Sequence, residues 1–132
     1  MKIDAEIRNG KLKTNPYHKE RLSRWISKND GSMIVIDYKK PKGQRSDRQN
    51  SYYWGVIIAM MCDETGYAKE ELHNWLKICY QQETGIKIEE DRLFSTTELD
   101  TKEAEEYYVY CRYIANEKLS LYIPLPNEQV GL

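Results

Sequence analysis

A basic segment between positions 39 and 48, "KKPKGQRSDR", has the clearest chemical potential in the chain. It carries five Lys and Arg residues against one Asp, a formal charge of +4. Several cations on one segment would neutralise several phosphates and release their counterions. Arg45 and Arg48 fall where a helix should begin, and cations oppose the helix dipole there, whereas phosphate is favoured. This placement favours anion binding over the alternative, a solvated loop.

Polar and aromatic residues follow directly in "QNSYYW". Asn50 is a poor helix former, so helix propensity does not explain its presence in a first turn, and we expect it to contribute to binding. Tyr53 and Trp54 align at helical spacing with the apolar residues behind them, which predicts packing. Tyr52 points elsewhere at that spacing, and we expect it to face outward and stack on a base, an interaction worth roughly 1–3 kcal/mol.

A hydroxyl-rich turn, "STTE", offers donors to phosphate oxygens from Ser95 and Thr96. The alternative is a loop that satisfies its own backbone, and the physical argument alone favours that alternative. The candidate DNA-binding residues are Lys39, Lys40, Lys42, Arg45, Arg48, Gln49, Asn50, Tyr52, Ser95 and Thr96.

No catalytic constellation stands out. His18 and His73 are isolated, and the chain has no HExxH, GxSxG, Walker or GxGxxG pattern. Clusters of Asp and Glu leave a metal-dependent nuclease open, because two-metal chemistry needs only a few carboxylates. The three cysteines form no CxxC pair, and we interpret them as free thiols. We therefore predict no catalytic residue, metal ligand or cofactor.

Charge is divided unevenly along the 132 residues, although the net charge is only −1. Residues 1–48 carry 13 Lys and Arg against 6 Asp and Glu, a charge of +7, and residues 49–132 carry −8. This division suggests polyanion binding by the first half. The longest apolar run has six residues and no signal peptide is evident, so we expect a cytoplasmic protein without a membrane segment.

The elements that would hold these residues alternate between strands and helices. Ile3, Ala5 and Ile7 predict a half-buried strand that enters a hairpin at Asn9-Gly10. A helix follows, capped by Asn15, with Leu22, Trp25 and Ile26 as its buried stripe. Residues 32–40, "SMIVIDYKK", then predict a strand, and its apolar run at 33–36 predicts that it is central in a sheet.

Helices dominate the remainder of the chain. Ser46 and Gln49 form a capping-box pattern that opens a helix running to about Gly66, and a second helix covers about 67–82. Short strands are expected at 86–88 and 93–95. Asp100 and Glu103 open a long helix over about 101–116. This order predicts an α+β fold with a small mixed sheet, one domain over 1–123 and a Pro-containing tail over 124–132.

Two motifs resemble the NinB/Orf family of phage recombination proteins. An Arg-Ser-x-x-Gln-Asn-x-x-x-Trp pattern falls on Arg45, Ser46, Gln49, Asn50 and Trp54, and a Ser-Thr turn before an acidic helix falls on Ser95 and Thr96. A downstream "HNWLK" and a closing "YIPLP" accompany them, and the similarity spans roughly residues 1–123.

The resemblance implies a NinB-like fold and a homodimer that binds single-stranded DNA without catalysis. Such a protein would be a recombination mediator that helps load a recombinase onto strands coated by a phage or host single-stranded-DNA-binding protein. The setting would be the cytoplasm of a bacterial host. Two alternatives remain open, the metal-dependent nuclease and a protein-interaction adaptor whose acidic half docks a basic partner.

Overall fold

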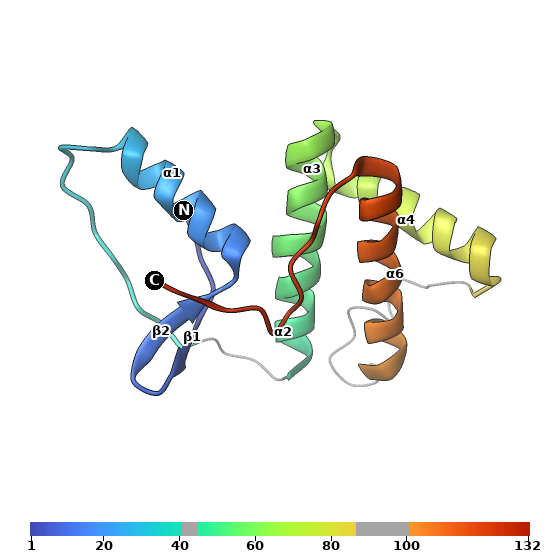
Figure 1. The fold of residues 1–132 in the computed structure, drawn as a ribbon, viewed down its shortest axis with the longest axis horizontal. Helices are drawn as coiled ribbons and strands as arrows, with labels where there is room; N and C mark the ends of the chain where they lie inside the picture. Colours follow the sequence, from blue (N-terminus) through green and yellow to red (C-terminus); the bar gives the residue numbers. More distant parts are fainter. Residues whose placement is uncertain (41–44, 87–100) are drawn as a thin grey trace. The chain divides into compact units, whose positions relative to one another are not determined.

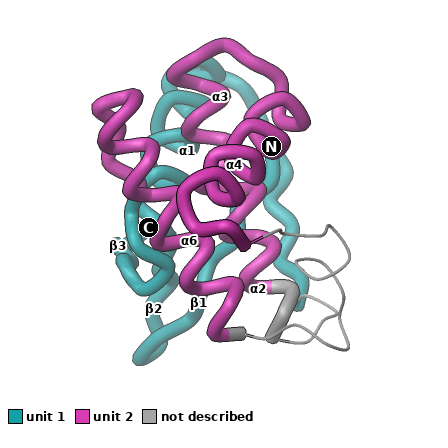
Figure 2. The backbone as a smooth tube through the Cα atoms, turned by 90° about the vertical axis from the view of Figure 1, so that its right-hand side faces the viewer, with its two compact units in different colours: residues 1–42, 124–132 teal, residues 43–123 magenta. Residues whose placement is uncertain are grey.

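The computed structural model describes residues 1–40, 45–86 and 101–132, with the backbone alone at 45–47 and 101. The chain forms two compact units, coloured separately in Figure 2. Unit 1 comprises residues 1–42 and 124–132, and unit 2 comprises residues 43–123. The sequence predicts one domain over 1–123 and a tail, whereas the structure groups the tail with the N-terminal residues.

Unit 1 contains a three-stranded antiparallel sheet in the order β1-β2-β3. Strands β1 (Ala5–Arg8) and β2 (Lys11–Thr14) form the predicted hairpin. Its turn residues Asn9 and Gly10 have φ values of 52° and 72°, the left-handed conformation that a two-residue hairpin turn requires. Strand β3 (Val130–Gly131) pairs with β2, so part of the predicted tail completes the sheet.

Helix α1 (Pro16–Lys28) begins and ends as predicted (Figure 1). The Asn15 side chain accepts a hydrogen bond from the Tyr17 backbone N–H at 3.0 Å, and Pro16 occupies the first turn, where its missing N–H costs nothing. The predicted buried stripe is only partly right. Leu22 and Trp25 are half-buried and Ile26 is exposed, because the buried face of α1 instead carries Tyr17 and His18.

The predicted central strand at 32–40 is wrong. This segment has no regular secondary structure, and the side chains of Met33 and Val35 are 97% and 95% exposed. The predicted buried face of β1 is also wrong, since Ile7 is 76% exposed. An apolar strand is buried only where a second layer covers it, and no described part of unit 1 covers these residues.

Unit 2 is helical in its described part. Helix α2 (Arg45–Tyr52) continues through a π-helical stretch, η1 (Tyr53–Ile58), into α3 (Ala59–Thr65). Gly66 ends this run in the left-handed conformation, as predicted. Helices α4 (Lys69–Thr84) and α6 (Thr101–Leu119) confirm the other two predicted helices.

Sheet and helices together confirm the α+β class. Most of the predicted strands at 86–88 and 93–95, and the predicted cap Asp100, lie outside the described residues; Ile86 itself is not in a strand. The described helices include none with both the length and the apolar character to cross a membrane.

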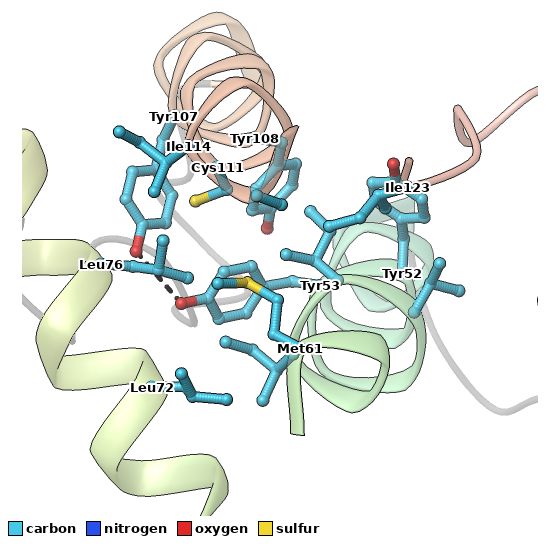
Figure 3. Packing of buried hydrophobic residues seen from close by; sticks show 14 of the residues in the cluster. Tyr52, Tyr53, Met61, Leu72, Leu76, Tyr107, Tyr108, Cys111, Ile114 and Ile123 are labelled. Atoms are coloured by element: carbon cyan, nitrogen blue, oxygen red, sulfur yellow. Dashed lines mark hydrogen bonds between the residues drawn. The ribbon is translucent and has the colours of Figure 1, made fainter. Parts of the chain in front are cut away.

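Aromatic side chains form the centre of unit 2 (Figure 3). Tyr53, Tyr107 and Tyr108 are fully buried. The Tyr53 hydroxyl lies 2.7 Å from Nδ1 of His73 and 3.1 Å from the Tyr107 hydroxyl, and both pairs are hydrogen-bonded. The Tyr53 ring stacks on Tyr108 with ring centroids 5.4 Å apart. These contacts join η1 to α4 and to α6.

Burial makes these phenols resist ionisation. Desolvation raises the pKa of Tyr53, Tyr107 and Tyr108 well above the ordinary value, and it raises the pKa of Tyr52 to about 12 from 10.0. Between these two values an unfolded chain loses the Tyr52 proton while the folded chain keeps it. By linkage, the contribution of the protonated Tyr52 to the free energy of unfolding is fully present below pH 10. It is lost as the pH rises from 10 towards 12.

We therefore expect the melting temperature to decrease steeply between pH 10 and pH 12, the interval set by Tyr52. Circular dichroism melts across this range measure it, with an ultraviolet titration of tyrosinate on the same samples. The buried tyrosines should form tyrosinate only together with unfolding. A single phase at the ordinary pKa with the helices intact would contradict the buried arrangement.

Candidate nucleic-acid interface

The basic segment enters a helix, as predicted, but the helix begins at Arg45 rather than after Ser46. Ser46 therefore lies inside the first turn, and the predicted capping box is wrong. Arg48 is exposed, and it forms no ion pair with any side chain that the structure describes. Its guanidinium group is thus available to an anion in solution.

Gln49 is occupied within the protein. It is half-buried, and its Nε2 donates a hydrogen bond to Oε1 of Glu105 on α6 at 3.1 Å. This bond replaces the predicted role of Gln49 in a cap. Gln49 is 56 positions from Glu105, so the bond ties α2 to α6, and Gln49 acts first as a tether between helices.

Asn50 is also half-buried. Its Oδ1 atom is inaccessible to solvent and has no hydrogen-bond partner in the described part of the chain. A buried acceptor without a partner is costly. A ligand that approaches through solvent cannot reach this oxygen, so any contact of Asn50 with DNA would have to use its amide nitrogen.

The prediction that Tyr52 faces outward is wrong. Its side chain is 8% exposed and packs edge-on against Tyr108, with ring centroids 6.1 Å apart. Nη1 of Arg112 donates to the Tyr52 hydroxyl at 3.1 Å. Burial raises the Tyr52 pKa, and the adjacent Arg112 charge moderates that increase. The reason is that α6 covers this side of α2, through Tyr108 and Arg112, so helical spacing alone misassigned this residue.

The remaining predicted DNA-binding residues either lie in unit 1 or are not fully described by the structure. Lys39 and Lys40 are exposed in unit 1, and Nζ of Lys39 lies 3.2 Å from Oδ2 of Asp37 in a solvent-exposed ion pair. Lys42, Ser95 and Thr96 lie outside the described residues, and of Arg45 only the backbone is described.

The structure adds one aromatic residue that the sequence reasoning missed. Tyr38 is 78% exposed and directly precedes Lys39 and Lys40. An exposed ring beside cations is the combination used by proteins that bind single strands, where bases stack on the ring and cations follow the backbone. The adjacency of "YKK" was the available signal, hidden because the residue was assigned to the end of a central strand.

Glu105 and Arg112 on α6 were missed as well. Both contact α2, and no local spacing in the sequence points to pairs separated by 56 and 60 positions. Both histidines are buried, His73 at 1% exposure inside the aromatic core and His18 at 6% on α1.

Acidic and thiol side chains form no described metal centre. Among the side chains of residues 1–40, 48–86 and 102–132, no group of three or more His, Cys, Asp or Glu is placed to hold a metal ion. The cysteines Cys62, Cys79 and Cys111 are free thiols, with Cys111 fully buried. The clusters at 89–91 and 98–100 lie outside the described residues.

Comparison with known proteins finds no match for this chain among protein-family models, curated proteins or solved structures. The NinB/Orf resemblance therefore stays a prediction carried by its sequence motifs.

Tyr52 gives a test of the corrected arrangement. Tyr52→Ala should lower the free energy of unfolding by about 3–5 kcal/mol, because it opens a cavity in the core. Tyr52→Phe keeps the ring and should cost about 1 kcal/mol through the lost hydrogen bond to Arg112. Urea denaturation measures both. A Tyr52→Ala protein of unchanged stability that binds DNA weakly would restore Tyr52 as a ligand contact.

Proposed function

We propose that this protein binds single-stranded DNA without cleaving it and acts as a recombination mediator. The observation that carries the proposal is the exposure of Lys40 and Arg48 within the +4 segment of residues 39–48 that leads into α2. The sequence motifs shared with the NinB/Orf family support the recombination role, in which the protein helps load a recombinase onto strands coated by a single-stranded-DNA-binding protein.

Charge supports binding to the phosphate backbone. The first 48 residues carry +7, and their cations are mostly exposed where the structure describes them. Binding of this kind weakens steeply with salt, because each neutralised phosphate releases counterions. We therefore propose an electrostatic contact with little sequence preference, as expected for a protein that must act on any strand.

Stacking supports single strands over duplex DNA. Tyr38 is exposed beside Lys39 and Lys40, and bases are free to stack on a protein ring only when they are unpaired. A duplex would still contact the cations but would gain nothing from this ring. The proposal therefore includes a preference for single strands that depends on Tyr38.

Reversal of charge tests the cationic contact. The double variant Arg45→Glu/Arg48→Glu should weaken binding to a labelled oligonucleotide at least tenfold and reduce the salt slope by roughly 2, since two phosphate contacts are lost. Fluorescence anisotropy over a salt titration measures both quantities. Circular dichroism should show unchanged helix content.

A charge-matched control is Lys69→Glu/Lys118→Glu, which changes the net charge equally at two exposed positions of unit 2 outside the basic segment. It should bind close to the wild type. An equal loss of DNA affinity in the two double variants would mean that net charge alone governs binding. It would contradict the assignment of the DNA contact to the start of α2.

The exposed ring has its own test. Tyr38→Ala should weaken binding to single-stranded DNA roughly tenfold. It should leave the weaker binding to duplex DNA unchanged. Tyr113→Ala, which removes a 53% exposed ring from α6, is the matched control. If Tyr38→Ala weakens single-strand and duplex binding alike, the ring does not create the preference.

A second candidate function is a protein-interaction adaptor. It is favoured by four acidic side chains that are all exposed near the turn from α3 to α4: Asp63, Glu64, Glu70 and Glu71. A basic partner protein would fit this acidic surface. A protein that acts only as an adaptor would bind such a partner and show no affinity for DNA at low salt.

A further inference from the structure

Arg112 on α6 is a half-buried cation that forms no ion pair with a carboxylate the structure describes. Its Nη1 atom donates a hydrogen bond of 3.1 Å to the Tyr52 hydroxyl, and its guanidinium carbon lies 5.9 Å from the centroid of the Tyr52 ring. Both contacts are to an uncharged side chain. The guanidinium group has further N–H donors, and no other described residue accepts from them.

A cation in this position is costly without an anion. Partial burial removes part of the water around the guanidinium group, and a neutral phenol returns less free energy than a charged partner would. The arginines of unit 1 have such partners although they are more exposed. Arg8 lies 3.1 Å from Glu6, and Arg24 lies 4.0 Å from Glu20. The pairing that Arg112 lacks among the described residues is one that an anion from solution can supply.

Arg48 on α2 supplies a second cation beside the same tyrosine. Arg48 and Tyr52 are one helical turn apart, a spacing that places Cβ atoms about 5–6 Å from each other. Arg48 is exposed and forms no ion pair with a described side chain. Tyr52 itself lies at the end of the aromatic cluster away from Leu72 (Figure 3). One side chain therefore has two cations as neighbours, one from α2 and the other from α6.

Glu105 is the acidic residue of α6 that also contacts α2, and it is engaged elsewhere. Its Oε1 atom accepts the hydrogen bond from Nε2 of Gln49 at 3.1 Å. Glu105 lies two helical turns before Arg112, roughly 10 Å along the helix axis. This separation is too long for an ion pair, so Glu105 does not neutralise Arg112.

We propose that Arg48 and Arg112 form one binding site for a phosphate group, with Tyr52 holding the Arg112 guanidinium group in place. Arginine binds phosphate oxygens through charge-assisted hydrogen bonds. The oxygens of a phosphate point in tetrahedral directions, so donors from two helices can bind one group. A carboxylate has both oxygens in one plane and is matched by a single guanidinium fork, which favours phosphate here.

In DNA binding, this site would extend the contact from the start of α2 to α6, and this part of the inference rests on the proposed function. The group bound there would be a phosphodiester of the strand. Inorganic phosphate has the same chemistry, so it serves as a second probe that does not require DNA binding.

The wild-type protein tests the site directly. In proton–nitrogen NMR spectra, the Nε–H signals of Arg48 and Arg112 should shift together, with one midpoint, as inorganic phosphate is added. The signals of Arg8 and Arg24, which have carboxylate partners, should shift far less. No shift at Arg112, or an equal shift at all four arginines, would overturn the proposal.

Removal of the charge provides the second test. Arg112→Gln should weaken binding to a labelled oligonucleotide roughly tenfold and reduce the salt slope by roughly 1, because one phosphate contact is lost. Arg112→Lys keeps the charge and should retain the salt slope. Lys118→Gln is the matched control, since Lys118 is an exposed cation further along α6, and it should bind like the wild type.

Two results of this comparison contradict the proposal. The first is an Arg112→Gln protein with unchanged affinity and salt slope. The second is an equal loss of slope in Arg112→Lys, because the loss would then come from a change in structure. If Arg112→Gln fails to fold, the phosphate titration of the wild-type protein still decides.

This inference and the proposed function fail separately. Phosphate-induced shifts at Arg48 and Arg112 in a protein that binds no DNA would uphold the phosphate site and refute DNA binding. Normal DNA binding without a shift at Arg112 would uphold DNA binding and refute the site. A response of Arg112 to a glutamate-rich peptide and none to phosphate would make the ligand a carboxylate and overturn the proposal.

Discussion

The fold of unit 2 depends on satisfying one buried hydroxyl group. Tyr53 lies at the centre of the aromatic core, where a hydroxyl without hydrogen bonds would cost about 1–3 kcal/mol. Its two partners, His73 and Tyr107, come from α4 and α6, so the hydroxyl is satisfied only when all three helical segments are in register. Figure 3 shows the Tyr53–Tyr107 bond within the apolar packing that surrounds it. The arrangement also fixes α2, which continues directly into the π-helical stretch that carries Tyr53.

Unit 1 presents the opposite situation. Its hairpin and α1 are well defined by local chemistry, the Asn9-Gly10 turn and the Asn15 cap, yet its described part buries few large apolar side chains. Met33 and Val35 in the segment after α1 are almost fully exposed. This segment leads directly into Tyr38, Lys39 and Lys40.

The sequence predicted what local chemistry determines. Turn residues, caps and helical periodicity located the hairpin, α1, the run from α2 to α3, α4 and α6, because each depends on residues a few positions apart. Packing was predicted correctly for Tyr53 and Trp54, but other faces were misassigned, because burial also depends on segments distant in the chain. Tyr52 was assigned to solvent since nothing local reveals Arg112 beside it, and the 33–36 run was assigned to a sheet since its composition suits one. The candidate site was predicted as a charged segment, whereas Gln49 and Tyr52 proved to be structural.

The central claim is that this chain binds single-stranded DNA through exposed cations and does not cleave it. The most direct test is the anisotropy of labelled single-stranded and duplex oligonucleotides with the wild-type protein across a salt titration, with magnesium present and the DNA checked on a gel afterwards. We predict tighter binding to the single strand, a steep loss of affinity with salt and intact DNA. Absence of binding at low salt would contradict it and favour the adaptor. Cleaved product that disappears on adding chelator would contradict it by making the protein a metal-dependent nuclease.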